Sequence, residues 1–207
     1  MTTTLKLYGA QTGNCIRAAI AFEEAGLSYA PSLVDLSSGE HMGADHLALN
    51  PAGKVSVLVE NEEGREPFIL TQSNAIILYA AAKAPGWLLP ESDRDRAIAY
   101  ERLLFFVTDV IAVSHAAFSL RALSAQEGRT ILEGRVLATL ETAERYVIDH
   151  EFMAGNTFSA ADIAGFTIAQ SVKSDLPWSK LPNLRQWFER IEGRPAVKRG
   201  LQAFNRI

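Results

Sequence analysis

Short hydrophobic clusters separated by polar turns occupy the first part of the chain, a pattern typical of alternating strands and helices. The predicted order is strand 5–8, helix 15–25, strand 29–34, a weak helix or irregular segment 39–49, strand 55–59, strand 68–70 and a helix that begins at 72–73. The first two strands flank a helix and pair in parallel, whereas the last two are joined by a tight turn and pair antiparallel. The pattern therefore predicts a mixed sheet.

The spacing of the hydrophobic residues changes after the segment 83–92, which is rich in proline and glycine. From there on the hydrophobic residues recur at helical spacing, and no strand is predicted. The predicted helices are 94–117, 126–150, 159–173, 182–192 and 195–203. The chain is thus predicted to have an α/β N-terminal domain, 1–82, a linker, 83–92, and an all-α C-terminal domain, 93–207.

A strong helix-start signal lies in the second half, at 158–163. Ser159 is placed to cap a helix, and Asp162 at the third helical position can reach back to the Ser159 backbone. Phe158 and Ile163 are spaced as the hydrophobic staple that accompanies such a capping box. We assign this box a structural role.

Composition and charge limit the classes of function. With 48% hydrophobic and 21% charged residues and a net charge of −4, the chain is predicted to be soluble, globular and without a nucleic-acid partner. The N-terminus lacks the pattern of a signal peptide, and apolar runs such as 103–107 are too short to span a bilayer, so we predict a cytoplasmic protein that does not enter a membrane. The single cysteine, Cys15, excludes an intramolecular disulfide, and no metal-ligand pattern is present.

The stretch 50–79 carries the clearest functional signal. A turn, Asn50 to Gly53, leads into a strand, a second strand follows, and Gln72 and Ser73 then stand where a helix begins. Backbone N–H groups and the helix dipole favour an anion at such a terminus. The stretch therefore predicts a seat for a ligand carboxylate.

The same stretch, with Asn-Pro-Ala-Gly-Lys-Val at 50–55, Gln-Ser at 72–73 and the helix through Tyr79, resembles the glutathione-binding domain of cytosolic glutathione S-transferases. The box at 158–163 and the closing segment 181–201 also resemble that family. The resemblance implies a thioredoxin-like domain followed by a helical domain, glutathione as co-substrate and a cytoplasmic homodimer. The implied activity is conjugation of glutathione to a small hydrophobic electrophile, or reduction of a disulfide or peroxide.

The resemblance also implies which residues hold glutathione. The backbone of Val55 would pair with the cysteinyl part, Gln72 and Ser73 would hold the γ-glutamyl carboxylate, and Lys54, with His41 as a second candidate, would reach the glycyl carboxylate. Each has an ordinary alternative: Ser73 as a helix cap, Lys54 as a solvated turn charge. The electrophile would lie between the domains, against Phe105, Thr108, Asp109 and Ala112.

The loop after the first strand offers four candidates for activating the thiol. Thr12 and Asn14 resemble the Thr-Pro-Asn-Gly pattern of bacterial Nu-class and fungal Ure2-like members, and either could instead cap the helix. Cys15 could form a mixed disulfide if it were exposed, or be a packing residue. Tyr8 is near the catalytic tyrosine of animal members, or part of the core. Arg17 is predicted to be solvated or salt-bridged.

Ser56 departs from the family pattern, which has a cis proline at this position. A cis bond before a residue other than proline costs roughly 3–4 kcal/mol, so a trans Val55–Ser56 bond with altered pairing is expected on energy alone. The alternative is a strained cis bond that the surrounding structure maintains. Ser56 keeps a second hypothesis open: a non-catalytic binding or protein-interaction module with an eroded thiol site.

Overall fold

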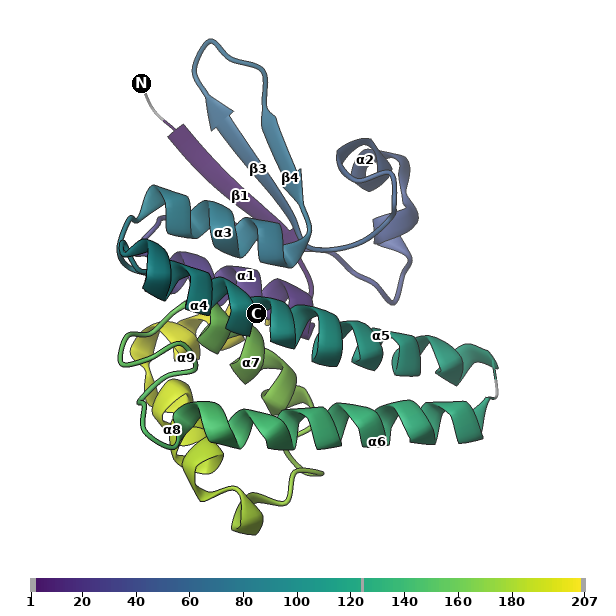
Figure 1. The fold of residues 1–207 in the computed structure, drawn as a ribbon. Helices are drawn as coiled ribbons and strands as arrows, with labels where there is room; N and C mark the ends of the chain where they lie inside the picture. Colours follow the sequence, from purple (N-terminus) through teal and green to yellow (C-terminus); the bar gives the residue numbers. More distant parts are fainter. Residues whose placement is uncertain (1–2, 124, 206–207) are drawn as a thin grey trace. The chain divides into compact units, whose positions relative to one another are not determined.

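The structure is a computed structural model that describes residues 3–123 and 125–205 (Figure 1). Its contacts divide the chain into two compact units. The first contains the described residues up to Leu88 together with those from Arg194 onwards, and the second spans Leu89–Gly193. The domain limits 1–82 and 93–207 stay a prediction, but the contacts group the last helix with the first unit.

The first unit contains a four-stranded sheet. Its elements are β1 Thr3–Gly9, α1 Gly13–Glu24, β2 Ala30–Leu33, the 3₁₀ turn Glu40–Met42, α2 Ala44–Leu49, β3 Val57–Glu62, β4 Phe68–Thr71, α3 Ser73–Lys83 and α9 Pro195–Gln202. The strand order is β2-β1-β3-β4, with β1 parallel to β2 and antiparallel to β3, and β3 antiparallel to β4. The predicted mixed sheet is confirmed.

The third strand begins two residues later than predicted. Val57 is the first residue of β3 with a partner on both sides, Tyr8 in β1 and Thr71 in β4. Val55 and Ser56 therefore precede the ladder, because the register of the neighbouring strands decides where pairing begins.

Helices α1 and α3 pack side by side against one face of the sheet (Figure 1). The hydrophobic core beneath them draws on β1, β3, both helices and the C-terminal segment. Its buried members are Leu5, Leu7, Cys15, Ala18, Ala19, Phe22, Leu58, Ile76 and Phe204. Because Phe204 belongs to this core, the described residues after α9 are part of the first unit.

Helix α9 approaches α1 closely. A Cβ atom at Gly200 would lie 2.8 Å from the backbone nitrogen of Ile20, so only glycine permits this distance. At the end of α1, Arg194 donates two hydrogen bonds of 2.7 Å to the carboxylate of Glu24, the bidentate geometry that favours arginine. The amphipathic pattern of 195–203 predicts that this helix buries one face, but it cannot say against which partner.

The secondary structure of the described residues in the second unit is helical apart from an isolated bridge between Phe152 and Gly155. Its predicted all-α character is confirmed. Its elements are α4 Asp93–Leu104, a π-helix Phe105–Ile111, α5 Ala112–Ser119, α6 Gln126–Thr142, α7 Ala160–Ser171 and α8 Pro182–Gly193, with 3₁₀ turns at Leu120–Leu123, Ala143–Val147 and Trp178–Lys180. Helices α5 and α6 run side by side (Figure 1), and the predicted helix 126–150 ends its α-helical part at Thr142.

The capping box at the start of α7 is confirmed and is larger than predicted. One oxygen of Asp162 accepts from the backbone N–H of Ser159 at 2.8 Å and from its hydroxyl at 3.0 Å. The other oxygen accepts from the backbone N–H of Met153 at 2.9 Å and from Nε1 of Trp187 at 2.8 Å. Asp162 is 0% exposed, so this carboxylate is fully enclosed by donors.

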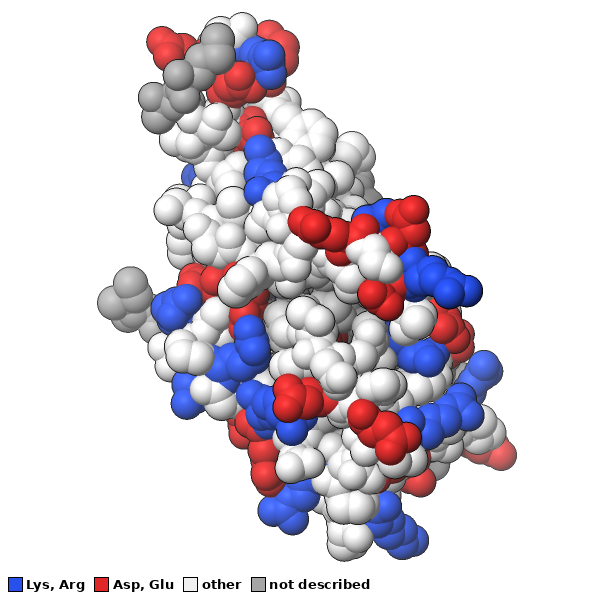
Figure 2. Space-filling model, turned by 60° about the vertical axis from the view of Figure 1, so that its left-hand side comes forward, with Lys and Arg blue, Asp and Glu red and all other residues white. Residues whose placement is uncertain are grey.

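Acidic and basic side chains are interspersed over the face shown in Figure 2, and no stripe of one sign runs across it. One helical run, Asp93–Leu123, has the length and composition of a membrane span, with a mean hydropathy of 1.8 in an 18-residue window of which 28% is buried. The uninterrupted apolar runs inside it stay short, because polar residues such as Thr108 and Asp109 divide them, so the expectation that the chain does not enter a membrane stays a prediction. A single such helix is weak evidence, since core helices of soluble proteins meet the same criteria.

Candidate functional site

Two helix N-termini of the first unit start without a side-chain cap. Helix α1 begins after Thr12 and helix α3 after Gln72, and in neither case does the N-cap side chain accept a hydrogen bond from the helix. Capping was the structural alternative for Thr12 and Ser73, and the structure does not show it. Uncapped N–H groups at these two adjacent helices leave donors for an anion.

Arg17 joins the two helix starts. Its Nη1 atom donates to Oδ1 of Asn14 at 3.0 Å and to Oγ of Ser73 at 3.3 Å. The residue predicted to act on the thiol and the residue predicted to bind the γ-glutamyl carboxylate therefore contact the same guanidinium nitrogen.

Arg17 is only 2% exposed, so of the two predicted alternatives, solvated or salt-bridged, the first is wrong. Burial lowers the pKa of its guanidinium to about 10, because the charged form loses its hydration, while the charge of Cys15 acts in the opposite direction. The sequence contained a signal that we did not use: Asn14 and Arg17 are three residues apart on a helix and therefore neighbours on its surface.

Cys15 is fully buried, and the condition of exposure set for a mixed disulfide is not met. Burial raises the pKa of its thiol, and the hydrogen bond that the hydroxyl of Thr12 donates to its sulfur at 3.3 Å only partly opposes this. The protonated thiol is therefore favoured, which makes Cys15 a poor nucleophile. Tyr8 is half-buried, with Nζ of Lys6 4.6 Å from the centre of its ring.

Gln72 occupies an unusual backbone conformation at the start of α3. Its φ is 73° and its ψ 111°, and its side chain is exposed. For a residue other than glycine a positive φ costs of order 1–3 kcal/mol and is found most often at ligand-binding sites. The backbone at Gln72–Ser73 is therefore held in a conformation that the residue type does not favour, as is common at ligand-binding sites.

The backbone before Val55 is held by two residues that we did not predict. Nδ2 of Asn50 donates to the Lys54 carbonyl at 2.7 Å, and Nε2 of His46 lies 3.1 Å from the same oxygen. Both side chains are buried, whereas the side chain of Lys54 is exposed. Asn50 and His46 thus anchor the peptide segment that carries the predicted pairing residue, Val55.

The Val55–Ser56 peptide bond is cis, so the expectation of a trans bond is wrong. That expectation considered only the local preference of the bond, whereas Ser56 lies in a buried segment, with 2% of its surface exposed, where the surroundings decide the conformation.

Three buried polar atoms in this part of the first unit have no hydrogen-bond partner among the described residues. They are Nδ1 of His41, Oγ of Ser56 and Oδ1 of Asn74. Buried polar groups are nearly always paired in folded proteins. All three belong to the stretch 41–74, which also contains the predicted glutathione contacts, and a bound polar ligand would supply partners for such atoms.

Comparison with known proteins agrees with this geometry. The family described as "Glutathione S-transferase, N-terminal domain" matches residues 3–82, and "Glutathione S-transferase, C-terminal domain" matches residues 111–195. The chain belongs to the glutathione S-transferase family. The disulfide-bond oxidoreductase YfcG of Escherichia coli is 28% identical over 95% of this chain and 94% of its own, and glutathione S-transferase 3 of Zea mays is 28% identical over 96% and 94%.

A solved structure shows the same transferase fold. A glutathione transferase from Burkholderia graminis, with two glutathione molecules bound per subunit, superimposes with a TM-score of 0.87. It is 25% identical and covers 99% of this chain and 90% of its own. Among the described residues of this transferase-family chain, no group of three or more His, Cys, Asp or Glu side chains is arranged to hold a metal ion.

The residues predicted to bind the electrophile lie on one helical segment of the second unit. Phe105, Thr108 and Asp109 belong to the π-helix, and Ala112 is the first residue of α5. The Phe105 ring packs edge-on against Tyr146, with 5.3 Å between centroids, and Thr108 and Asp109 are exposed. Single-turn π-helices occur frequently at functional sites, but the electrophile site itself stays a prediction.

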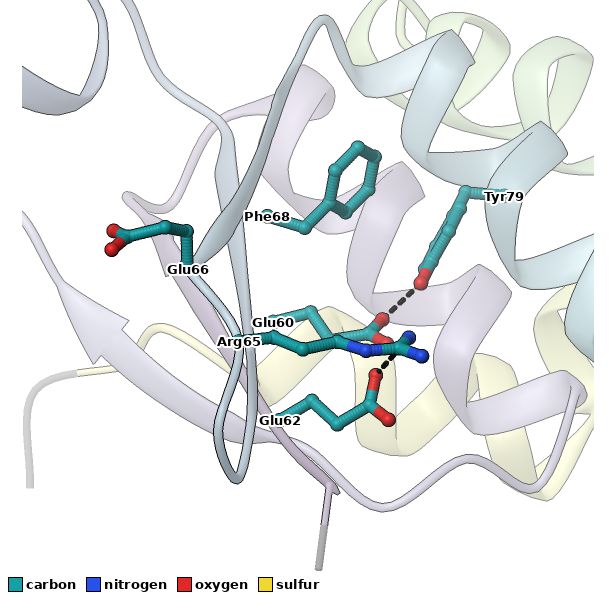
Figure 3. A pocket seen from close by; sticks show the side chains of 6 residues that line it. All are labelled: Glu60, Glu62, Arg65, Glu66, Phe68 and Tyr79. Atoms are coloured by element: carbon teal, nitrogen blue, oxygen red, sulfur yellow. Dashed lines mark hydrogen bonds and ion pairs between the residues drawn. The ribbon is translucent and has the colours of Figure 1, made fainter. Parts of the chain in front are cut away.

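A separate pocket of about 310 Å³ lies on the first unit, beside β3, β4 and α3 (Figure 3). The Tyr79 hydroxyl donates to Glu60, and Nη1 of Arg65 is 2.8 Å from Glu62. No predicted site residue lines it, and its carboxylates would repel the carboxylates of glutathione. The lining residues are Glu60, Glu62, Arg65, Glu66, Phe68 and Tyr79.

Proposed function

We propose that this chain is a glutathione-dependent enzyme that stabilises the glutathione thiolate at the start of α1 and binds the γ-glutamyl carboxylate at the start of α3. The observation that carries the proposal is the contact of Asn14 and Ser73 with one nitrogen of Arg17. The two acceptor atoms are within roughly 6 Å of each other, and a tripeptide spans up to about 10 Å. One glutathione molecule can therefore contact both.

The first unit offers donors suited to a peptide with two carboxylates. The uncapped N–H groups and hydroxyl of Ser73, with Gln72, would hold the γ-glutamyl carboxylate, and the exposed Lys54 would reach the glycyl carboxylate. His41 supports the second contact, since its Nδ1 is buried without a partner among the described residues. The backbone of Val55 would pair with the cysteinyl residue, on a segment anchored through the Lys54 carbonyl.

At the thiol end, Asn14 is the better candidate of the two loop residues. The hydroxyl of Thr12 donates to the sulfur of Cys15, whereas the amide of Asn14 uses its oxygen for Arg17 and keeps its N–H groups for a ligand. A thiolate that accepts such a bond at an uncapped helix start is stabilised relative to the thiol.

The burial of Cys15, the single cysteine of the chain, limits how a disulfide could be reduced. Reduction would use two glutathione molecules: one thiolate attacks the disulfide and releases the first thiol, and a second attacks the resulting mixed disulfide. The products are two thiols and oxidised glutathione. The relative named a disulfide-bond oxidoreductase and the neighbour with two bound glutathione molecules support this reaction, and the maize transferase supports conjugation.

The test combines calorimetric titration with glutathione and two assays, one of disulfide reduction and one of conjugation. We expect Ser73→Ala to weaken glutathione binding about tenfold, equal to about 1.4 kcal/mol, with little change in turnover at saturation. Asn14→Ala should lower turnover more than binding. Ser171→Ala, at an exposed serine of the second unit that donates within its own helix, is the control.

No heat at millimolar glutathione would overturn the proposal. Binding without turnover in either assay would instead favour the non-catalytic binding module. The homodimer, the cytoplasmic location and the hydrophobic electrophile stay predictions, of which light scattering would check the first.

A further inference from the structure

Arg17 is a buried cation between two ligand-facing polar side chains. It lies in the first turn and a half of α1, is 2% exposed, and donates to Asn14 on its own helix and to Ser73 on α3. Burying a charge is costly unless other groups compensate it. The acceptor atoms of Asn14 and Ser73 belong to the groups that compensate this charge.

The chemistry of the guanidinium fixes the direction of both hydrogen bonds. Arginine has five N–H donors and no acceptor, so Asn14 must present its oxygen and Ser73 must present a lone pair. The amide N–H groups of Asn14 and the O–H of Ser73 then remain as donors directed to other partners. Without this constraint, an asparagine amide can turn over and a serine hydroxyl can rotate.

We propose that Arg17 is a positioning residue that sets Asn14 and Ser73 as donors at the same time, one toward the thiolate and one toward the γ-glutamyl carboxylate of the same glutathione molecule. This inference rests on the proposed function. In this proposal one buried side chain, Arg17, links the end of the site that binds the thiol to the end that binds the carboxylate.

The geometry requires arginine rather than lysine. Nη1 carries two hydrogens in a fixed plane, which allows two bonds to acceptors on different helices while the long stem stays packed. The ammonium of lysine keeps the charge but ends in one flexible donor group. Arg17→Lys therefore keeps the charge and loses the positioning, whereas Arg17→Met loses both.

The experiment measures binding and thiol ionisation separately in the full chain. S-Methylglutathione has no thiolate, so its Kd reports on the carboxylate end, and the ultraviolet absorbance of bound glutathione as a function of pH reports the thiol pKa. In both Arg17→Met and Arg17→Lys we expect the Kd for S-methylglutathione to rise about tenfold and the pKa of bound glutathione to rise by about one unit.

Single variants at the two ends distinguish positioning from a general loss of structure. Ser73→Ala should change the Kd but not the thiol pKa, and Asn14→Ala the reverse. In the Arg17→Met background, each of these changes should have less than half of its effect, because the side chain that it removes is no longer directed. Arg194→Met, which removes a half-buried ion pair at the far end of α1, is the matched control and should change neither quantity.

Should the Arg17 variants not fold, nuclear magnetic resonance of the unmodified protein keeps the inference testable, since positioning by Arg17 predicts a single orientation of the Asn14 side-chain amide and a restrained Arg17 guanidinium before glutathione binds. Several orientations of the Asn14 amide, or Arg17 variants that change only the melting temperature, would overturn the inference while the proposed function stands. Failure of the unmodified protein to bind glutathione would overturn both.

Discussion

The start of α7 and the starts of α1 and α3 show two different uses of a helix N-terminus. At α7 the carboxylate of Asp162 accepts four hydrogen bonds from within its own unit, and nothing is left for a ligand. At α1 and α3 no N-cap side chain satisfies the helix, and the buried charge beside them, Arg17, is a donor. We call the first a closed start and the other two open starts.

The difference teaches how to tell a structural charge from a functional one. Both side chains are almost completely buried, so burial does not separate them. They differ in the hydrogen-bonding groups that the internal bonds leave for a ligand. The closed start leaves none, whereas the open starts leave the amide donors of Asn14 and the hydroxyl donor of Ser73.

Asp162→Ala should lower the free energy of unfolding by about 3 kcal/mol, because it leaves several buried donors of the closed start without an acceptor. Chemical denaturation measures this change. The Kd of glutathione for the folded protein should not change. A loss of binding without a loss of stability would contradict the structural role of the closed start.

Asn14→Asp should convert an open start into a closed one. The new carboxylate would pair with Arg17 and lie at a helix N-terminus, which raises the free energy of unfolding by about 1 kcal/mol. It also replaces the amide donors by a negative charge beside the thiolate, so kcat should fall by about 100-fold. Steady-state kinetics and thermal unfolding together check this. Asn61→Asp, at an exposed position of β3, is the matched control.

Gln72→Gly should raise the free energy of unfolding by about 0.5 kcal/mol, because relief of the positive φ slightly exceeds the entropy that glycine adds to the unfolded chain. The Kd for glutathione should rise about two- to threefold, because the substitution removes one exposed hydrogen bond to the ligand and such bonds contribute little. If the free energy of unfolding instead falls as it does when glycine replaces a residue of ordinary backbone conformation, the conformation of Gln72 is under no special constraint.

Cys15→Ser should change activity least, less than about twofold, because the buried thiol is not a nucleophile. Burial raises the pKa of this thiol in the folded state. The unfolded thiol therefore ionises first, and the stability that the thiol contributes is lost as the pH rises above its ordinary value. Compared with Cys15→Ser, the unmodified protein should lose stability as the pH rises above about 8.5, the ordinary pKa of a cysteine thiol. Loss of disulfide reduction in Cys15→Ser would reinstate the cysteine as a nucleophile.

Much of the fold and part of the site were predictable because their determinants are local. The mixed sheet, the all-α second unit and the capping box follow from the spacing of hydrophobic residues and of Ser159 and Asp162. The positions of Asn14 and Ser73 at helix starts follow from turn residues next to them in the chain. Neighbours along the sequence constrain each of these features.

The rest depends on contacts between residues distant in sequence. The hydrophobic face of 195–203 indicates burial, but only the folded chain shows that it packs on α1 with Phe204 in the core of the first unit. Arg17 looks like a surface charge until α3 covers it, and Cys15 looks like a nucleophile until the core encloses it. Sequence spacing determines where a side chain lies on its own helix, whereas the element packed against that helix determines whether the side chain is solvated, buried or held in place for a ligand.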